Sequence, residues 1–192
     1  MTLDILAIAA HPGEAEASCG GTLLRMAERG YRTGILDLTA GAAPEFAVAW
    51  RESLNLPSGR LENSLAARLT IAVRIRELRP RVVILPYWES TDPDQVHGCA
   101  LAAEACFLAG QPELEEYSER HRVDRILYAS FFSEVRPSFV VDVSEQFARR
   151  PAGEDRERVE VLGRFHGSRI GVRYGEPYVM KEALALGDIV QV

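Results

Sequence analysis

The first residues able to do chemistry are a histidine and two carboxylates that follow an apolar segment near the N-terminus. The segment 8–10 ends at His11-Pro12, and Glu14 and Glu16 come within the next five positions. An imidazole and a carboxylate three positions apart across a tight turn can face one point. Zinc accepts both imidazole nitrogen and carboxylate oxygen. His11 and Glu14 are therefore candidate metal ligands.

A metal hydrolase needs about three protein ligands, an open position for water, and a base that takes the proton of that water. The remaining groups must come from other segments. Polar or aromatic residues follow the expected ends of strands at 39–41 and 87–95, and again at 174–177. Because the carboxyl ends of parallel strands meet at one edge of a sheet, we expect 39–41 and 87–95 to lie beside His11.

The pattern of apolar residues predicts alternating strands and helices. Short continuous apolar runs indicate buried parallel strands, and apolar stripes between capping residues indicate helices. Asp92 is expected to cap the helix that begins at Pro93, and Gly30 to follow the end of the first helix. The expected strands are 4–10, 33–39, 81–86, 125–131 and 138–143, and the expected helices are 15–29, 65–78 and 93–110; 41–63 is expected to be irregular, and 149–158 to be a charged loop leading into a helix that ends at Gly167. This order predicts one α/β domain over residues 1–192, Rossmann-like, with a mainly parallel sheet flanked by helices.

The composition excludes several classes of protein. Of the 192 residues, 26% are charged and 8% aromatic, which is typical of a folded globular chain. The net charge of -6 weighs against a nucleic-acid partner, and no apolar stretch reaches the about 18 residues of a membrane span. The three cysteines form no Cys-x-x-Cys pair, and the N-terminus has no secretory pattern. We expect a cytoplasmic protein without disulfides and without a nucleic-acid or membrane partner; a homo-oligomer is a possible assembly.

Several segments together resemble the LmbE/PIG-L family of zinc-dependent N-deacetylases. Residues 9–23 are similar to its motif A-H-P-D-D-x-E followed by G-C-G-G-T-L, with Gly13 and Glu14 in place of the two aspartates. Asp92-Pro93-Asp94-Gln95 stands where the family has H-P-D-H. Further similar segments are 39–41 (T-x-G), 55–59 (N-L-x-L-P-D-G), 79–83 (R-P-x-V-V) and 171–177 (G-V-x-Y-A-E-P-F). The resemblance covers most of the chain, although 41–50 and 143–159 are shorter than in the family.

The resemblance implies hydrolysis of an N-acetyl group on an amino-sugar conjugate, with zinc activating a water. In the family the first aspartate is the base, the second and two histidines hold zinc, and another histidine stabilises the transition state. Carried over, this implies His11, Glu14 and Gln95 as metal ligands, with Gly13 at the position of the base and Asp92 at that of the transition-state histidine. Glycine cannot take a proton, an amide is a weak zinc ligand, and an ionised aspartate would repel a developing oxyanion.

The surrounding candidates have roles that the sequence leaves open. Glu16 matches the glutamate of the family motif, and we expect it to support the site or to cap the helix. Thr39 and Asp94 are expected beside the site, and Tyr87 and Trp88, with Trp50, could line a sugar-binding cleft, although aromatic residues near strand ends more often pack in the core. His11-Pro12 could likewise be only a turn that ends a strand, and the carboxylates only the polar start of a helix.

The glycine and cysteine residues nearby also have structural interpretations. Gly20-Gly21 permits close packing of a helix on a strand. Cys99 and Cys106 lie on one helical face, as core residues do. Cys19, near the start of a helix, could have a lowered pKa, but a packed thiol is the more common case.

These observations favour a homologue of the deacetylases whose zinc and catalytic site is degraded. We expect it to be inactive or severely weakened, with zinc bound weakly or not at all. The alternative is a working metal-dependent N-deacetylase with a rewired site, in which Glu14 or Asp92 serves as the base. A nucleotide-binding or redox module lacks support, because the sequence has neither a G-x-G-x-x-G nor a Cys-x-x-Cys motif.

Overall fold

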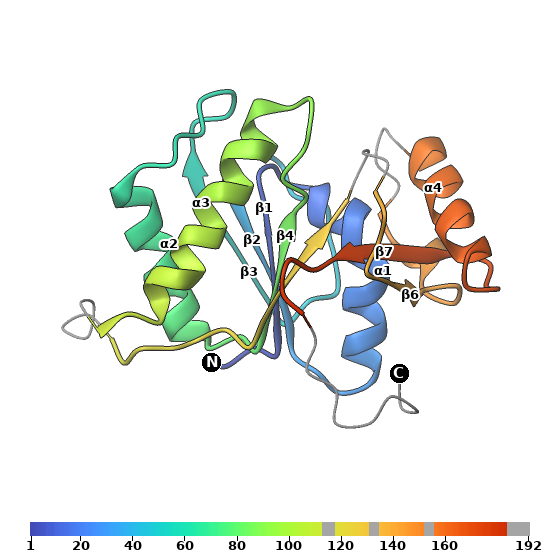
Figure 1. The fold of residues 1–192 in the computed structure, drawn as a ribbon, viewed down its shortest axis with the longest axis horizontal. Coiled ribbons are helices and arrows are strands. Elements are labelled where there is room, and N and C mark those ends of the chain that lie inside the picture. The colour runs from blue at the N-terminus through green and yellow to red at the C-terminus, as the bar shows by residue number, and fades with distance from the viewer. Residues whose placement is uncertain (113–117, 131–134, 152–155, 184–192) are drawn as a thin grey trace.

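The computed structural model describes residues 1–112, 118–130, 135–151 and 156–183, which build one seven-stranded sheet flanked by helices (Figure 1). The strand order is β3-β2-β1-β4-β5-β7-β6. The first five strands run parallel, and β7 runs antiparallel to both β5 and β6. The elements are β1 (Ile5–Ala9), α1 (Glu14–Glu28), β2 (Thr33–Thr39), β3 (Trp50–Leu56), α2 (Leu65–Leu78), β4 (Val82–Pro86), α3 (Pro93–Ala109), β5 (Arg125–Ala129), β6 (Phe139–Asp142), the short 3-10 helix η2 (Phe147–Arg149), α4 (Arg156–Ser168) and β7 (Gly175–Val179). The predicted α/β class with a mainly parallel sheet is confirmed.

Each face of the sheet has its own core, because successive side chains of a strand point to opposite faces. On one face, Leu6 and Ile8 of β1 pack with buried residues of α2 and α3. On the other face, Ile5, Ala7 and Ala9 pack with α1. Figure 1 shows α2 and α3 covering one face of the sheet and α1 lying behind it. Because β1 is buried on both faces, its sequence is continuously apolar.

Two strands lie where the sequence predicts none. β3 falls in the segment 41–63, which is expected to be irregular. Among the described strands it pairs only with β2, at the edge of the sheet, and its polar residues obscure the apolar pattern of a strand. β7 covers most of the polar segment 174–177, where no strand is predicted. Pairing with β5 involves only Tyr178 and Val179, so Pro177 lies beyond the part of β7 that β5 covers.

Boundaries elsewhere agree with the sequence to within a residue or two, except that α4 begins at Arg156, three residues inside the predicted loop 149–158. The helix predicted over 65–78 is α2, and Asp92 caps α3 by accepting a hydrogen bond from the Asp94 backbone N–H. Gly30 follows α1 with a left-handed backbone. Residue 131 of the predicted fifth strand, and 152–155 of the predicted charged loop, lie outside the described residues.

Close approach of α1 to the strand β7 explains the glycine pair in that helix. A Cβ at Gly21 would lie 2.7 Å from Cβ of Val143 and 2.9 Å from Oε1 of Glu176. The buried Glu176 carboxylate accepts hydrogen bonds from the backbone N–H groups of Gly21 and Thr22 and from the Thr22 hydroxyl. Close packing of the helix on a strand is therefore confirmed at Gly21, whereas an added Cβ at Gly20 would lie 3.2 Å from Cδ of Arg150, outside the strands. Glu176 connects β7 to α1.

The three cysteines are buried and have free thiols. Burial raises the pKa of Cys99 to about 11 and that of Cys106 to about 12, and it raises the pKa of Cys19 well above its ordinary value. The packed thiol expected at Cys19 is confirmed, and its alternative, a lowered pKa, is wrong, because burial of the thiol raises the pKa. None of the helices that the structure describes is both long and apolar enough to cross a membrane.

Candidate metal site

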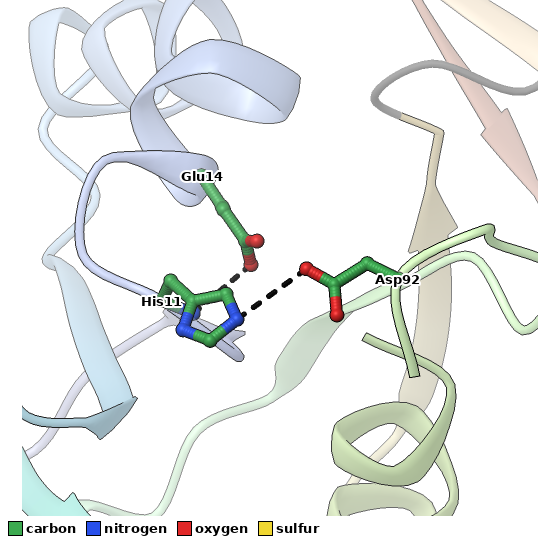
Figure 2. Close-up of side chains that lie close together, drawn as sticks. All are labelled: His11, Glu14 and Asp92. Carbon is green, nitrogen blue, oxygen red and sulfur yellow. Dashed lines mark hydrogen bonds and ion pairs between the residues drawn. The ribbon is translucent and has the colours of Figure 1, made fainter. Parts of the chain in front are cut away.

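Three chain segments meet at the carboxyl edge of the parallel strands. The turn after β1 carries His11 and leads through Gly13 to Glu14, the first residue of α1. The segment after β4 carries Asp92, and α3 then begins and presents Gln95 in its first turn. These segments lie together because β1 and β4 are parallel neighbours. The four side chains expected to converge at this edge do so, and Figure 2 shows three of them.

His11 is held by contacts at both ring nitrogens. Its Nδ1 lies 2.8 Å from the hydroxyl of Thr39, the last residue of β2. Its Nε2 lies 3.5 Å from Oδ2 of Asp92 and 3.5 Å from Oδ2 of Asp94. The His11 backbone N–H donates to Oε2 of Glu14 at 3.0 Å. The imidazole therefore presents Nε2 to a group of carboxylates.

Glu14 is held in place from two sides. Oε2 accepts the backbone hydrogen bond of His11, and Oε1 accepts one from Nε2 of Gln95 at 2.8 Å. Burial raises the pKa of Glu14 above its ordinary value, while the hydrogen bonds from Gln95 and His11 act in the opposite direction. The carboxylate is thus fixed beside the imidazole.

The side-chain amide of Gln95 is oriented toward Glu14 by Ser90. The Ser90 hydroxyl donates to Oε1 of Gln95 at 2.7 Å and itself accepts a hydrogen bond from the Asp92 backbone N–H. Gln95 therefore presents N–H groups to the carboxylate, and its amide oxygen already has a partner. Gln95 thus acts as a hydrogen-bond donor to Glu14.

Asp92 brings a second carboxylate to the same point. Its Oδ1 accepts the capping hydrogen bond from the Asp94 N–H at 2.9 Å, and its Oδ2 faces His11 (Figure 2). One ligand atom each from His11, Glu14 and Asp92 lies within 4.8 Å of the other two. In the described parts of the chain, no other group of three histidine, cysteine or acidic residues is so close.

One imidazole and two carboxylates are donors that a divalent cation accepts, and their three ligand atoms lie within 4.8 Å of one another. Ligand atoms about 2.0–2.2 Å from a tetrahedral zinc lie about 3.3–3.6 Å apart, and of the three distances the His11–Asp92 contact of 3.5 Å falls in that range. One imidazole and two carboxylates are also acceptable to manganese or iron. From the sequence, Asp92 is a candidate catalytic base and not a metal ligand. In the structure it is the N-cap of α3, just before Pro93, and this position places its carboxylate beside His11.

Asp94 supports the site through the backbone of a neighbouring loop. Its side chain is buried, and it accepts hydrogen bonds from the backbone N–H groups of Gly59 at 2.5 Å and Leu61 at 3.0 Å. This fixes the segment after β3 against the start of α3. His97 points to the same segment, with Nδ1 2.7 Å from the Leu61 carbonyl.

Glu16 lies near the site in a buried charge cluster that the sequence does not reveal. It forms an ion pair with Arg51 of β3, which also donates to Oδ2 of Asp37 in β2 at 2.8 Å. The three side chains connect α1 with β2 and β3. A buried carboxylate is stable only when it is paired or hydrogen-bonded, because burial of a lone charge is costly. Nothing in the sequence identifies Arg51 as its partner.

The aromatic residues divide between the site and the core. Tyr87 lines a cavity of about 20 Å³ beside Glu14, with room for about one water. Trp88 packs edge-on against Tyr128, with ring centroids 4.9 Å apart, and Lys181 lies over its ring. Trp50 is at the amino end of β3, the opposite edge of the sheet, so its expected place in the cleft is wrong.

Comparison with known proteins finds similar solved structures that cover nearly all of the chain, although no family model matches it. The structure is similar to the conserved protein TT1542 from Thermus thermophilus, with 31% identity, coverage of 97% of this chain and 98% of that one, and a TM-score of 0.84. It shares its fold with the 4-carboxy-2-hydroxymuconate hydratase GalB from Pseudomonas putida, at 15% identity, 98% and 100% coverage, and a TM-score of 0.83.

A deacetylase has the same fold. N,N'-diacetylchitobiose deacetylase from Pyrococcus horikoshii matches at 19% identity, with coverage of 91% of this chain and 82% of that one, and a TM-score of 0.77. The predicted deacetylase-type fold is therefore supported. Since a hydratase shares it, the fold alone does not select a reaction, and the function must be argued from the site.

Proposed function

We propose that the chain, which belongs to the same family as TT1542, is a degraded N-deacetylase of the LmbE/PIG-L type that retains a divalent-cation site. His11, Glu14 and Asp92 are the proposed ligands. The observation that carries this proposal is the contact of 3.5 Å between His11 Nε2 and Asp92 Oδ2, because it supplies a third donor where Gln95 supplies none. The proposed substrate class is an amino-sugar conjugate with an N-acetyl group.

The donor set predicts weak zinc binding. Where the family places a second imidazole, this chain offers a carboxylate, and zinc prefers nitrogen and sulfur donors more strongly than manganese or magnesium do. The amide of Gln95 does not compensate, because its oxygen accepts a hydrogen bond from Ser90 and its N–H groups face Glu14. We expect manganese to compete with zinc at this site far better than it would at a site with two imidazoles.

The residues around the proposed cation limit the rate of hydrolysis. A bound cation would act as a Lewis acid on the carbonyl of the substrate, but attack also needs a base, and Gly13 has no group that takes a proton. General base catalysis typically contributes about 10²–10⁴-fold. An ionised Asp92 in place of a transition-state stabiliser costs about a further 10²–10³-fold. Each loss alone is severe.

One observation favours a working hydrolase as the second candidate. Burial raises the pKa of Glu14, and a carboxylate with a raised pKa is better suited to take a proton from water. In that case Glu14 either takes a proton from water without binding the cation, or does both. Against this, both carboxylate oxygens of Glu14 already accept hydrogen bonds.

Calorimetric titration of the metal-free protein with Zn²⁺ and Mn²⁺ tests the cation site. We expect one weakly bound ion, lost in His11→Ala and in Asp92→Ala but retained in Gln95→Ala. His121→Ala is a matched control, since Nε2 of His121 lies 2.7 Å from the carbonyl of Pro80, just before the amino end of β4 and thus at the opposite edge of the sheet. Tight zinc binding that survives Asp92→Ala and disappears in Gln95→Ala would contradict the proposed ligand set.

An assay on a panel of N-acetylated amino sugars, with either metal, tests the activity. We expect no turnover by the natural chain and partial recovery in the triple variant Gly13→Asp, Asp92→His, Gln95→His. Robust turnover by the natural chain that is lost in Glu14→Ala would establish the second candidate and contradict the first.

A further inference from the structure

The hydroxyl of Thr39 lies between two groups at the candidate site. Its Oγ1 is 2.9 Å from the carbonyl oxygen of Ala10 and 2.8 Å from Nδ1 of His11. A hydroxyl has one hydrogen to donate and can accept further bonds, whereas a carbonyl oxygen can only accept. The hydrogen of Thr39 therefore goes to Ala10, since otherwise two oxygens would face each other at 2.9 Å without a hydrogen between them.

This assignment determines the state of the imidazole. With its hydrogen donated to Ala10, the Thr39 oxygen can only accept from His11, so Nδ1 of His11 carries a hydrogen. In a neutral imidazole the other nitrogen then has the free lone pair. That nitrogen, Nε2, is the one that faces Asp92 and Asp94.

We propose that Thr39 is a positioning residue that holds His11 in the Nδ1-protonated tautomer, with the lone pair of Nε2 directed at the cation site. Its effect on cation affinity rests on the proposed function, whereas its effect on the tautomer does not. Partners that accept from the second nitrogen of a ligating histidine commonly fix its tautomer, and their loss typically lowers metal affinity by about 10–100-fold.

The sheet itself fixes the position of this hydroxyl. Thr39 is fully buried at the end of β2. Its backbone N–H donates to the carbonyl of Ala10 at 3.0 Å, and its own carbonyl accepts from the Ser53 hydroxyl at 2.9 Å. Because the segment after β1 and the strand β3 hold the backbone on both sides, the orientation of His11 follows from strand pairing.

The decisive variant is Thr39→Val, which keeps the shape of the side chain and removes the hydroxyl. Thr39→Ser keeps the hydroxyl and serves as the rescue. Thr33→Val is the matched control: Thr33 is also buried, at the other end of β2, and its hydroxyl has no hydrogen-bond partner among the described residues. It makes the same chemical change on the same strand, away from the site.

The first readout is the imidazole nitrogen spectrum of the metal-free protein, recorded by NMR at a pH where the histidines are neutral. The His11→Gln variant assigns the His11 signals among those of the four histidines. We expect a protonated Nδ1 in the natural chain, in Thr39→Ser and in Thr33→Val, and a mixture of tautomers in Thr39→Val. An unchanged His11 spectrum in Thr39→Val would overturn the proposal.

The second readout is titration with Zn²⁺. We expect Thr39→Val to weaken binding about 10–100-fold, with Thr39→Ser and Thr33→Val close to the natural chain. Equal affinity in Thr39→Val would overturn a role in cation binding. If the natural chain itself binds no zinc, the proposed function fails at this site, and the nitrogen spectra alone still decide whether Thr39 sets the tautomer.

Discussion

Gly13 is the position at which the loss of the catalytic base can be tested apart from the rest of the site. It connects the turn after β1 to α1 with a left-handed backbone, at φ 96° and ψ -22°. Space does not restrict this position, because an added Cβ would have no atom of the described residues within 4 Å beyond its own chain neighbours. Gly13→Ala therefore measures the backbone conformation alone, and Gly13→Asp adds the carboxylate.

The expected cost follows from two opposing effects. A left-handed backbone costs a residue with a Cβ roughly 1–2 kcal/mol. Replacing glycine also restricts the unfolded chain, which stabilises the fold by about 0.4–1 kcal/mol. The difference is a net loss of about 1 kcal/mol for Gly13→Ala, or about 2–4 °C in Tm for a domain of this size. Aspartate tolerates the left-handed region better than alanine, so Gly13→Asp should lose less.

Thermal and urea unfolding of the two variants measure this loss. Gly30→Ala is the control, since Gly30 also has a left-handed backbone and open space around it in the described structure, but lies at the far end of α1. We expect a similar loss there. A Tm for Gly13→Ala equal to or above that of the natural chain would refute the reasoning. If Gly13→Asp folds as expected yet gains no activity, the missing base is not the only defect of the site.

Two further predictions concern the reactivity of the buried thiols and the pH dependence of the free energy of unfolding in acid. Because burial raises the pKa of Cys99 to about 11 and that of Cys106 to about 12, the native protein should not react with Ellman's reagent at about pH 8, whereas all its thiols should react in guanidinium; rapid labelling of the native state would contradict this burial. Hydrogen bonds from Ser144 lower the pKa of Asp142, so its contribution is present above about pH 4 and is lost as the pH falls through the lowered pKa. In urea titrations, the free energy of unfolding of Asp142→Asn should therefore fall less steeply in acid than that of the natural chain, and equal slopes would be the contrary result.

Local sequence patterns predict those elements whose environment is uniform along their length. β1 and β2 are buried on both faces, so their apolar runs are visible in the sequence. α3 begins at the capping residue predicted for it, Asp92, and α2, which has its predicted bounds, is capped by Ser64. β3 and β7 are not predicted, because their polar residues contact partners that are distant in the sequence. Arg51 of β3 forms an ion pair with the buried Glu16, and Glu176 of β7 accepts a hydrogen bond from the backbone of α1.

The candidate site, too, could be predicted from the sequence only in part. Its position at the carboxyl edge could be predicted, because strand direction and order determine which turns meet. The orientation of each side chain could not. Gln95 faces Glu14 because Ser90, five positions earlier, holds its amide oxygen, and Asp92 reaches His11 because it caps a helix whose start is fixed by Asp94. Such chains of hydrogen bonds depend on three-dimensional contacts, which the spacing of residues along the sequence does not show.

The position of β7 in the sheet has a consequence for how the chain folds. It lies between β5 and β6, and it is the only strand paired with β6 in the described part of the chain, although it is the last strand described. The parallel part, β1 to β5, can form before β7 is available, but the other end of the sheet cannot. We expect the unit of β6, α4 and β7 to dock last and to open first in hydrogen exchange. A chain that ended before Gly175 would leave β6 without its partner strand and the N–H groups of Gly21 and Thr22 without the Glu176 carboxylate.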